Sequence, residues 1–148
     1  MANTLSEHGH VNRGVCSIGK DGLLQSIVET VQIEKTADGA KAPGTDGKIQ
    51  KFTGNEIVSM NLWGFKTSSF NFLEEEFRNF INKFGMELKS ELYIPTSLDR
   101  FVRNGQISIK ILMSNDKWFG VTYREDKPFV VENINNMIAR GVYPAKIY

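Results

Sequence analysis

The chain has 148 residues, a length that predicts one domain with a sizeable core. Its formal net charge of +1 offers no basic field for nucleic acid. No apolar run approaches the roughly 20 residues needed to span a bilayer, and the first ten residues lack the apolar stretch of a signal peptide. Cys16 is the single cysteine, which excludes an internal disulfide. We therefore expect a cytoplasmic protein without nucleic-acid or membrane partners.

The first part of the chain is expected to form strands. Residues 1–12 are polar and are predicted to be a flexible segment. Residues 13–18 and 23–35 are rich in β-branched side chains and flank a Lys-Asp-Gly turn signal, which predicts a hairpin. The stretch at about 36–54 is rich in Gly and Pro and indicates a mobile loop or an exposed hairpin tip. Residues 56–65 are expected to form the next strand.

An amphipathic helix is predicted after this strand. Apolar side chains recur at spacings of three and four from Phe70 to Phe84. Ser68 or Ser69 can cap the start of this helix, and Gly85 ends it.

Two further helices and one strand are predicted in the rest of the chain. A short helix follows Pro95, and the alternation at 107–111 indicates a half-buried strand. Thr122 and Glu125 form a capping box that opens the last helix. The buried stripe of that helix is expected to contain Val130 or Val131, Ile134, Met137 and Ile138. The order of elements predicts an α/β fold with a mixed, incomplete sheet flanked by helices.

Glu29 is the most informative single residue. Alternate residues of a strand share a face, so we expect Glu29 to lie in a row with Ile27, Val31 and Ile33. A carboxylate in an apolar row is costly unless it is paired or solvated. Either this face opens into a cleft, or a bulge in the strand turns Glu29 outward.

Two other groups of residues allow both a functional and a structural interpretation. Ser59, Asn61 and Trp63 form a polar row that suits hydrogen bonds to hydroxyl groups or is a solvated sheet face. The segment 117–122 leads into a helix N-terminus that favours phosphate or carboxylate, or it is a packed aromatic turn.

The remaining candidate nucleophiles and metal-ligating residues show no pattern typical of a catalytic or metal site. His8 and His10 lie in a polar tail without a nearby Cys or acid cluster and make a poor metal site. Cys16 has no base nearby in the sequence and is predicted to be a small core residue.

Five short strings follow one another along the chain in a recognisable order. They are Arg13-Gly14-Val15-Cys16, Ser26-Ile27-Val28-Glu29, residues 58–65, residues 91–95 and residues 118–122. In this order they resemble bacterial sugar-1-phosphate nucleotidyltransferases, from about Asn3 to Tyr148. The resemblance implies the C-terminal part of a Rossmann-like, GT-A-type fold of the nucleotide-diphospho-sugar transferases.

The resemblance also implies roles for particular residues. Residues 13–148 would form the half of the domain that binds the sugar phosphate. The backbone of Gly14 would approach the sugar, and Glu29 would accept hydrogen bonds from its hydroxyls. Ser59 and Asn61 fall at the first and third positions of a strand motif that reads N-T-G in better-known relatives, which leaves open which of them contacts sugar. Tyr93 lies in the segment that lines the sugar pocket.

The nucleotide half of the family's domain has no counterpart in this chain. Its glycine-rich loop and its Mg²⁺-binding aspartate are both absent. Nucleoside triphosphate would thus bind only through a missing N-terminal half, and Mg²⁺ is expected in the full-length enzyme but not tightly bound here. The family's second metal ligand lies in the turn before the last helix, and this chain has no acidic residue at the matching position. Asp116 lies near that position but does not align with it, so no metal ligand is assigned.

The implied reaction joins a nucleoside triphosphate to a sugar-1-phosphate and releases pyrophosphate, and this chain alone is expected to be inactive. The alternative is a stand-alone binding or interaction module derived from the same fold, which dimerises through an exposed sheet edge. A third interpretation is a carbohydrate- or phosphate-binding regulator.

Overall fold

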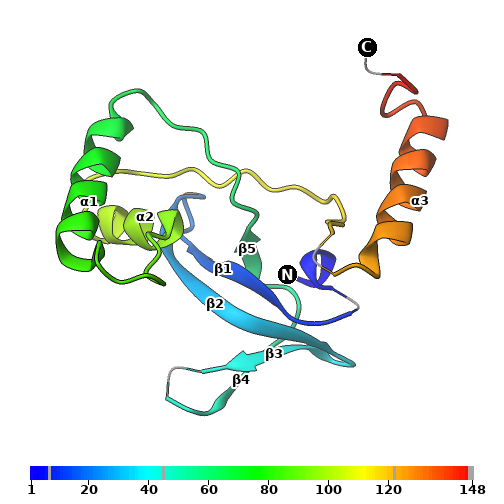
Figure 1. Ribbon diagram of the computed structural model, residues 1–148, viewed down its shortest axis with the longest axis horizontal. Helices are drawn as coiled ribbons and strands as arrows, with labels where there is room; N and C mark the ends of the chain where they lie inside the picture. Colours follow the sequence, from blue (N-terminus) through cyan, green and yellow to red (C-terminus); the bar gives the residue numbers. More distant parts are fainter. Residues whose placement is uncertain (7, 45, 122, 147–148) are drawn as a thin grey trace.

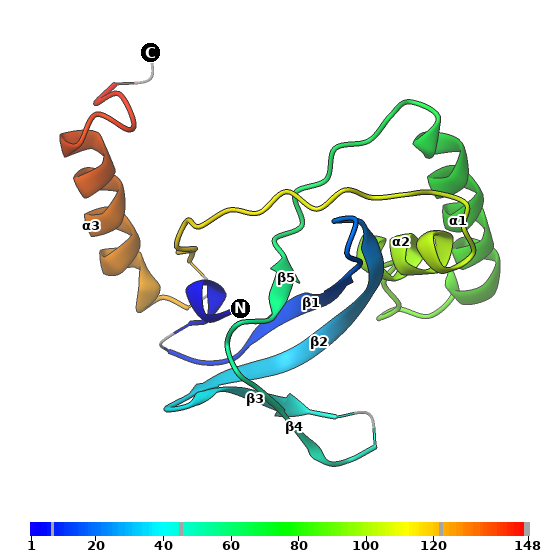
Figure 2. The same ribbon diagram turned by 180° about the vertical axis from the view of Figure 1, so that it is seen from behind.

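The computed structural model describes residues 1–6, 8–44, 46–121 and 123–146. Within them, five strands form one sheet in the order β4-β3-β2-β1-β5, with three α-helices outside it (Figures 1 and 2). The predicted α/β class is confirmed, but the mixed sheet is wrong, because all the strand pairings described are antiparallel. Successive strands from β1 to β4 are joined by short turns, and such turns connect antiparallel neighbours.

The predicted hairpin is formed by β1 (Val11–Ile18) and β2 (Leu24–Thr36). The register shifts once near each end of the pair, between Val11 and Arg13 and between Ser17 and Ile18. At the first of these bulges Gln32 adopts a φ of 54°, in the left-handed region. The bulge adds one residue to β2 and therefore changes which side chains face each side of the sheet.

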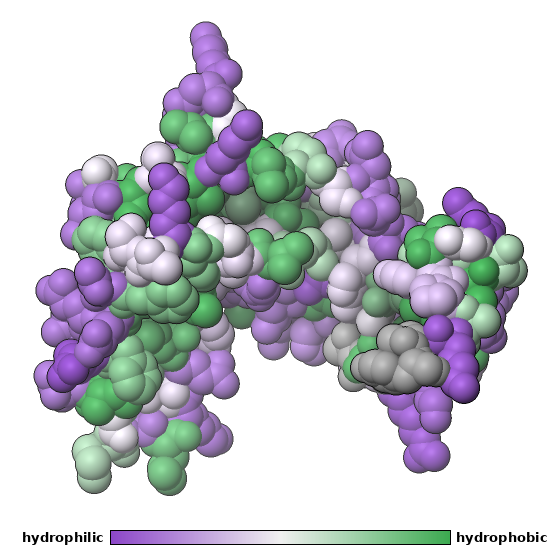
Figure 3. Space-filling model, turned by 90° about the horizontal axis from the view of Figure 1, so that it is seen from above, coloured by the Kyte–Doolittle hydropathy of each residue, from purple (hydrophilic) through white to green (hydrophobic). Residues whose placement is uncertain are grey.

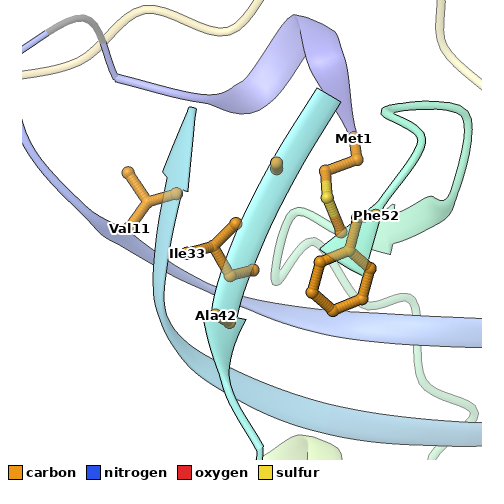
Figure 4. Close-up of a cluster of buried hydrophobic side chains, with 6 residues drawn as sticks. Met1, Val11, Ile33, Ala42 and Phe52 are labelled. Atoms are coloured by element: carbon orange, nitrogen blue, oxygen red, sulfur yellow. The ribbon is translucent and has the colours of Figure 1, made fainter. Parts of the chain in front are cut away.

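The stretch predicted as a mobile loop or hairpin tip contains a second hairpin. Strands β3 (Gly39–Pro43) and β4 (Ile49–Phe52) pair with each other, and β3 pairs with the end of β2. Their small apolar residues enter a core cluster drawn in Figure 4, which comprises Met1, Val11, Ile33, Ala40, Ala42 and Phe52.

The N-terminal segment differs from the predicted flexible tail. Met1 is buried in the core cluster, and a short 3-10 turn, η1 (Ala2–Thr4), follows it. The Ala2 amide donates to the Gly54 carbonyl at 2.8 Å, and the Met1 ammonium donates to the Glu56 carbonyl. The side chain of Met1 holds the segment in place because it fills apolar space over the sheet.

The fifth strand is much shorter than the predicted 56–65. Strand β5 (Ile57–Ser59) pairs with β1. Two residues later Asn61 has a φ of 55°, which interrupts the extended conformation. Asn is one of the few residues that adopts this conformation at little cost.

The first two helices form where they were predicted. They are α1 (Ser69–Phe84) and α2 (Ile94–Arg103). The ring centroids of Phe72 on α1 and Phe101 on α2 lie 5.8 Å apart. Arg100 on α2 also forms an ion pair with Glu76 on α1. Leu98 and Phe101 are buried as α2 packs on β2. Ser68 precedes α1 without capping it through its side chain.

The strand expected at 107–111 is reduced to an isolated bridge between Leu23 and Lys110. Helix α3 (Asp126–Ala139) forms as predicted, whereas Thr122 of the expected capping box lies outside the described residues. The Tyr123 amide instead donates to Asp126 Oδ2 at 2.7 Å.

The expected buried stripe of α3 is wrong, because this helix stands apart from the sheet (Figures 1 and 2). Val131 is half-exposed, and Val130, Ile134, Met137 and Ile138 are only partly buried. Figure 3 shows apolar side chains at the surface towards both ends of the molecule. In the described part of the chain, no helix combines the length and the apolar composition required to cross a membrane.

Candidate functional site

Three of the predicted site residues lie side by side across three strands. Gly14 on β1 pairs with Glu29 on β2 and, on its other side, with Ser59 on β5. Directly opposed residues of neighbouring strands share one face of a sheet. Glu29, Gly14 and Ser59 therefore form a row, which we call the polar row.

The centre of the polar row has no room for a side chain. A Cβ atom at Gly14 would lie 2.7 Å from Ile27 Cδ1 and 3.4 Å from Ser59 Cβ. Ile27 is itself buried beside Gly14, and Gly14 is buried too. The glycine thus lets Ile27 pack between the two polar ends of the row.

Glu29 has an unusual environment. Its Oε2 atom is buried and has no hydrogen-bond partner among the described residues. Burial raises the pKa of the Glu29 carboxyl because it disfavours the charged form, and the positive charge of Arg13 opposes this shift. The polar row therefore contains a buried acceptor oxygen without a partner among the described residues.

The apolar row expected around Glu29 is only partly present. Ile33 packs in the core cluster, against which Val15 and Val58 also pack. Val15 is paired between Val28 and Val58, so this cluster lies on the face opposite Gly14 and Glu29. The bulge at Gln32 moves Ile33 to that face and leaves Glu29 with Ile27 and Val31. The two alternatives for Glu29 were a cleft on its face and a bulge that turns it outward. The strand does contain a bulge, but the bulge changes the face of Ile33 and not that of Glu29.

Arg13 acts on Glu29 from the other face of the sheet. Its Nη2 donates to the Thr4 carbonyl at 2.6 Å, and its guanidinium lies 4.7 Å from the centroid of the Trp118 ring. The Trp118 amide donates to the Asn3 carbonyl at 2.9 Å. These contacts favour the packed aromatic turn for the segment 117–122, whose Thr122 lies outside the described residues.

Tyr93 and Asn61 lie outside the polar row. The half-exposed Tyr93 side chain precedes α2; a hydrogen bond to Glu91 raises the pKa of its hydroxyl, and the negative charge of Glu29 adds to the shift. Tyr93 is therefore within electrostatic range of Glu29. Asn61 is exposed, and its amide donates to Ser59 Oγ at 3.1 Å. The predicted row of Ser59, Asn61 and Trp63 is wrong, since the chain leaves the extended conformation at Asn61.

Asp99, which was not predicted as a site residue, links α2 to the sheet. Asp99 Oδ1 accepts a hydrogen bond from the Ile27 amide at 2.7 Å, and its Oδ2 lies 2.7 Å from Arg103 Nε. This contact holds the edge of β2 beside the polar row. The spacing of Asp99 and Arg103 predicts an ion pair on the surface of a helix. Nothing in the sequence indicates that the second carboxylate oxygen of Asp99 binds a strand.

The described residues contain no cluster of potential metal ligands. No three His, Cys, Asp or Glu side chains among them gather as ligands. Asp116 Oδ2 accepts a hydrogen bond from Ser114 Oγ at 2.7 Å. The Nε2 atom of His8 lies 3.9 Å from Asp126 Oδ1 in a contact of two side chains.

The hollow over β1 and β2 lies away from the polar row. It has a volume of about 230 Å³ and is lined by Val15, Cys16, Ser17, Ser26, Val28, Thr30 and Gln50. Most of these belong to the face that carries Val15, opposite Glu29. Burial raises the pKa of the Cys16 thiol, which disfavours the reactive thiolate.

The polar row offers hydrogen-bonding groups. Glu29 supplies a carboxylate acceptor, Ser59 a hydroxyl, and Tyr93 a second hydroxyl nearby. None of the described contacts places a nucleophile beside a general base, so the arrangement suits binding. Neither a comparison with protein-family models nor one with curated proteins finds a match to this chain.

Proposed function

We propose that this chain binds the sugar of a sugar-1-phosphate through the polar row and forms the acceptor part of a nucleotidyltransferase. The observation that carries the proposal is the buried Oε2 atom of Glu29, which has no hydrogen-bond partner among the described residues. An unpaired buried acceptor costs about 1–3 kcal/mol, and a ligand hydroxyl that donates to it recovers part of this cost.

The neighbours of Glu29 fit a polyhydroxylated ligand. Ser59 lies at the other end of the polar row, and its hydroxyl can donate to a sugar oxygen. Tyr93 is half-exposed and presents both a hydroxyl and an aromatic face.

The order of the five sequence strings supports the nucleotidyltransferase assignment and a GT-A-type fold. In that reaction an oxygen of the sugar-1-phosphate attacks the α-phosphate of a nucleoside triphosphate, and pyrophosphate leaves. The residues of this chain would bind and orient the sugar, whereas a nucleotide-binding half would hold the triphosphate and Mg²⁺. We also propose that the chain acts in the cytoplasm.

Titration calorimetry with a panel of sugar-1-phosphates tests this proposal. We expect Glu29→Gln to weaken binding about tenfold, because a neutral amide replaces a charged acceptor. Glu34→Gln is the matched control on the same strand, where Glu34 pairs with Lys41 at the surface at 3.1 Å, and should leave the affinity unchanged. The unmodified chain should release no pyrophosphate from any nucleoside triphosphate.

Three results would contradict the proposal. If no sugar-1-phosphate of the panel binds, this class of ligand is excluded. If Glu29→Gln and wild type bind with equal affinity, Glu29 does not contact the ligand. Pyrophosphate release by the chain alone would show that it is more than an acceptor part.

One observation favours a second candidate, which is carbohydrate binding without a phosphate. Arg13, whose charge acts on Glu29, makes its contacts on the opposite face of the sheet. Free sugars titrated under the same conditions separate the two candidates. Equal affinities for a sugar and its 1-phosphate would favour a carbohydrate-binding module.

A further inference from the structure

The two edges of the sheet carry different protection against pairing. The edge formed by β4 has Lys51 in the strand and Lys48 just before it. Lysine on an edge strand disfavours pairing with another strand. The edge formed by β5 lacks such a charge, because all nine residues from Ile57 to Phe65 are uncharged.

Apolar side chains are exposed in the segment that follows β5. Met60 is 43% exposed and Leu62 is 93% exposed. As the last strand of the sheet, β5 also presents outward-facing backbone groups to solvent. An uncharged, apolar edge of this kind is a template for a further strand.

The charges that flank this segment select the direction of pairing. Glu56 precedes the uncharged residues and Lys66 follows them. If two copies pair antiparallel about an axis at Asn61, Glu56 of each copy lies opposite Lys66 of the other. The same register places Met60 opposite Leu62, which joins the two exposed apolar side chains. A parallel arrangement would instead place like charges side by side, which is unfavourable.

We propose that a second copy of this chain pairs antiparallel with the outer edge of β5, about a two-fold axis at Asn61. Residues 60–65 become extended when the copies pair. Asn61 interrupts the extended conformation with a φ of 55°, and Asn moves between this conformation and an extended one at small cost.

The pairing has a consequence for the polar row, which rests on the proposed function. Ser59 lies opposite Trp63 of the second copy in this register, and opposed residues share a face. The indole would thus border the open end of the polar row. In the single chain, the side-chain nitrogen of Trp63 is buried without a hydrogen-bond partner among the described residues.

A disulfide test measures the register directly. In a Cys16→Ser background, Asn61→Cys places two thiols opposite each other on the two-fold axis. Opposed Cα atoms are about 4.5–5.5 Å apart, which is within the range that a disulfide spans. Lys66→Cys in the same background is the control, since its two copies would lie about 33 Å apart. Oxidation should give a covalent dimer for Asn61→Cys and none for Lys66→Cys.

Sedimentation equilibrium of the ligand-free chain tests the association itself. We expect a monomer–dimer equilibrium that Leu62→Asp weakens at least tenfold. Leu88→Asp is the matched control, because Leu88 is fully exposed and lies outside the paired segment, and it should leave the equilibrium unchanged.

A wild-type chain that stays monomeric at every concentration would overturn the inference. Undiminished association of Leu62→Asp, or equal cross-linking of the two cysteine variants, would also overturn it. Because both experiments are done without ligand, loss of sugar binding in the titrations above would leave this inference standing.

Discussion

Glu29 brings an ionisable group into a partly buried position on β2. Burial raises the pKa of its carboxyl, and the opposing charge of Arg13 does not cancel the shift. The folded chain therefore holds this proton more tightly than the unfolded chain does. Glu29 consequently contributes stability that is fully present below the pKa of the unfolded carboxyl, and that is lost as the pH rises through the raised pKa.

We predict that Glu29→Gln is more stable than wild type at pH 7, and that the difference disappears below a pH of about 4. The amide resembles the protonated carboxyl, so it avoids the cost of burying a charge at neutral pH. Urea unfolding at both pH values measures the free energies. Glu34→Gln is the exposed control, for which we expect a change of about 0–1 kcal/mol at pH 7. A less stable Gln variant at pH 7 would indicate that the carboxylate has a stabilising partner.

Residues in the left-handed region limited what the sequence could predict. A regular strand alternates its side chains between two faces, which predicts one face for Glu29 and Ile33 and one face for Ser59 and Trp63. Gln32 and Asn61 break both patterns, with φ values of 54° and 55°. A bulge forms only when two strands pair, so local sequence does not specify it. Gly14, Glu29 and Ser59 were predicted individually by resemblance, and their alignment follows from strand register.

At the scale of elements, α2 is joined to the sheet by a carboxylate as well as by the packing of Leu98 and Phe101. Asp99 Oδ1 accepts the Ile27 amide at 2.7 Å, on the edge of β2 that β3 leaves free at this position. Without Asp99 this partly buried amide would lose its acceptor.

We predict that Asp99→Ala lowers the free energy of unfolding by about 1–3 kcal/mol, and that the Ile27 amide exchanges faster with solvent. Glu74→Ala removes the exposed pair with Arg78 on α1 and serves as the control, with an expected cost of about 0.3–0.5 kcal/mol. Urea unfolding and amide exchange by NMR measure the two effects. Equal costs for both substitutions would show that Asp99 does not hold α2 to the sheet.

The elements with strong periodicity were predicted well, and those that depend on distant contacts were not. The hairpin of β1 and β2 and the helices α1 and α2 follow from local patterns of apolar and turn residues. Strand β3 contains Gly, Ala and Pro, and its pairing with β2 and β4 determines its conformation. The alternation at 107–111 predicts a strand, yet among the described residues it forms only an isolated bridge, between Lys110 and Leu23, which precedes β2.

At the scale of the whole molecule, α3 is joined to the rest through the N-terminal segment. The Trp118 amide donates to the Asn3 carbonyl at 2.9 Å, and the Tyr123 hydroxyl donates to the His10 carbonyl at 3.2 Å. These hydrogen bonds lie before the helix, and Figures 1 and 2 show α3 itself away from the sheet. Of the residues of α3, Asp126 alone is fully buried.

Because little apolar surface of α3 is buried, local opening of this helix should cost much less free energy than global unfolding. Helix α2 is shorter but buries Leu98 and Phe101 against β2. We therefore predict that amides of α3 exchange with deuterium faster than those of α2, although the longer helix has more internal hydrogen bonds. Exchange measured by mass spectrometry at several times compares the two helices, with the β1–β2 hairpin as the protected reference. Protection of α3 equal to that of the hairpin would mean that its apolar stripe is covered in solution.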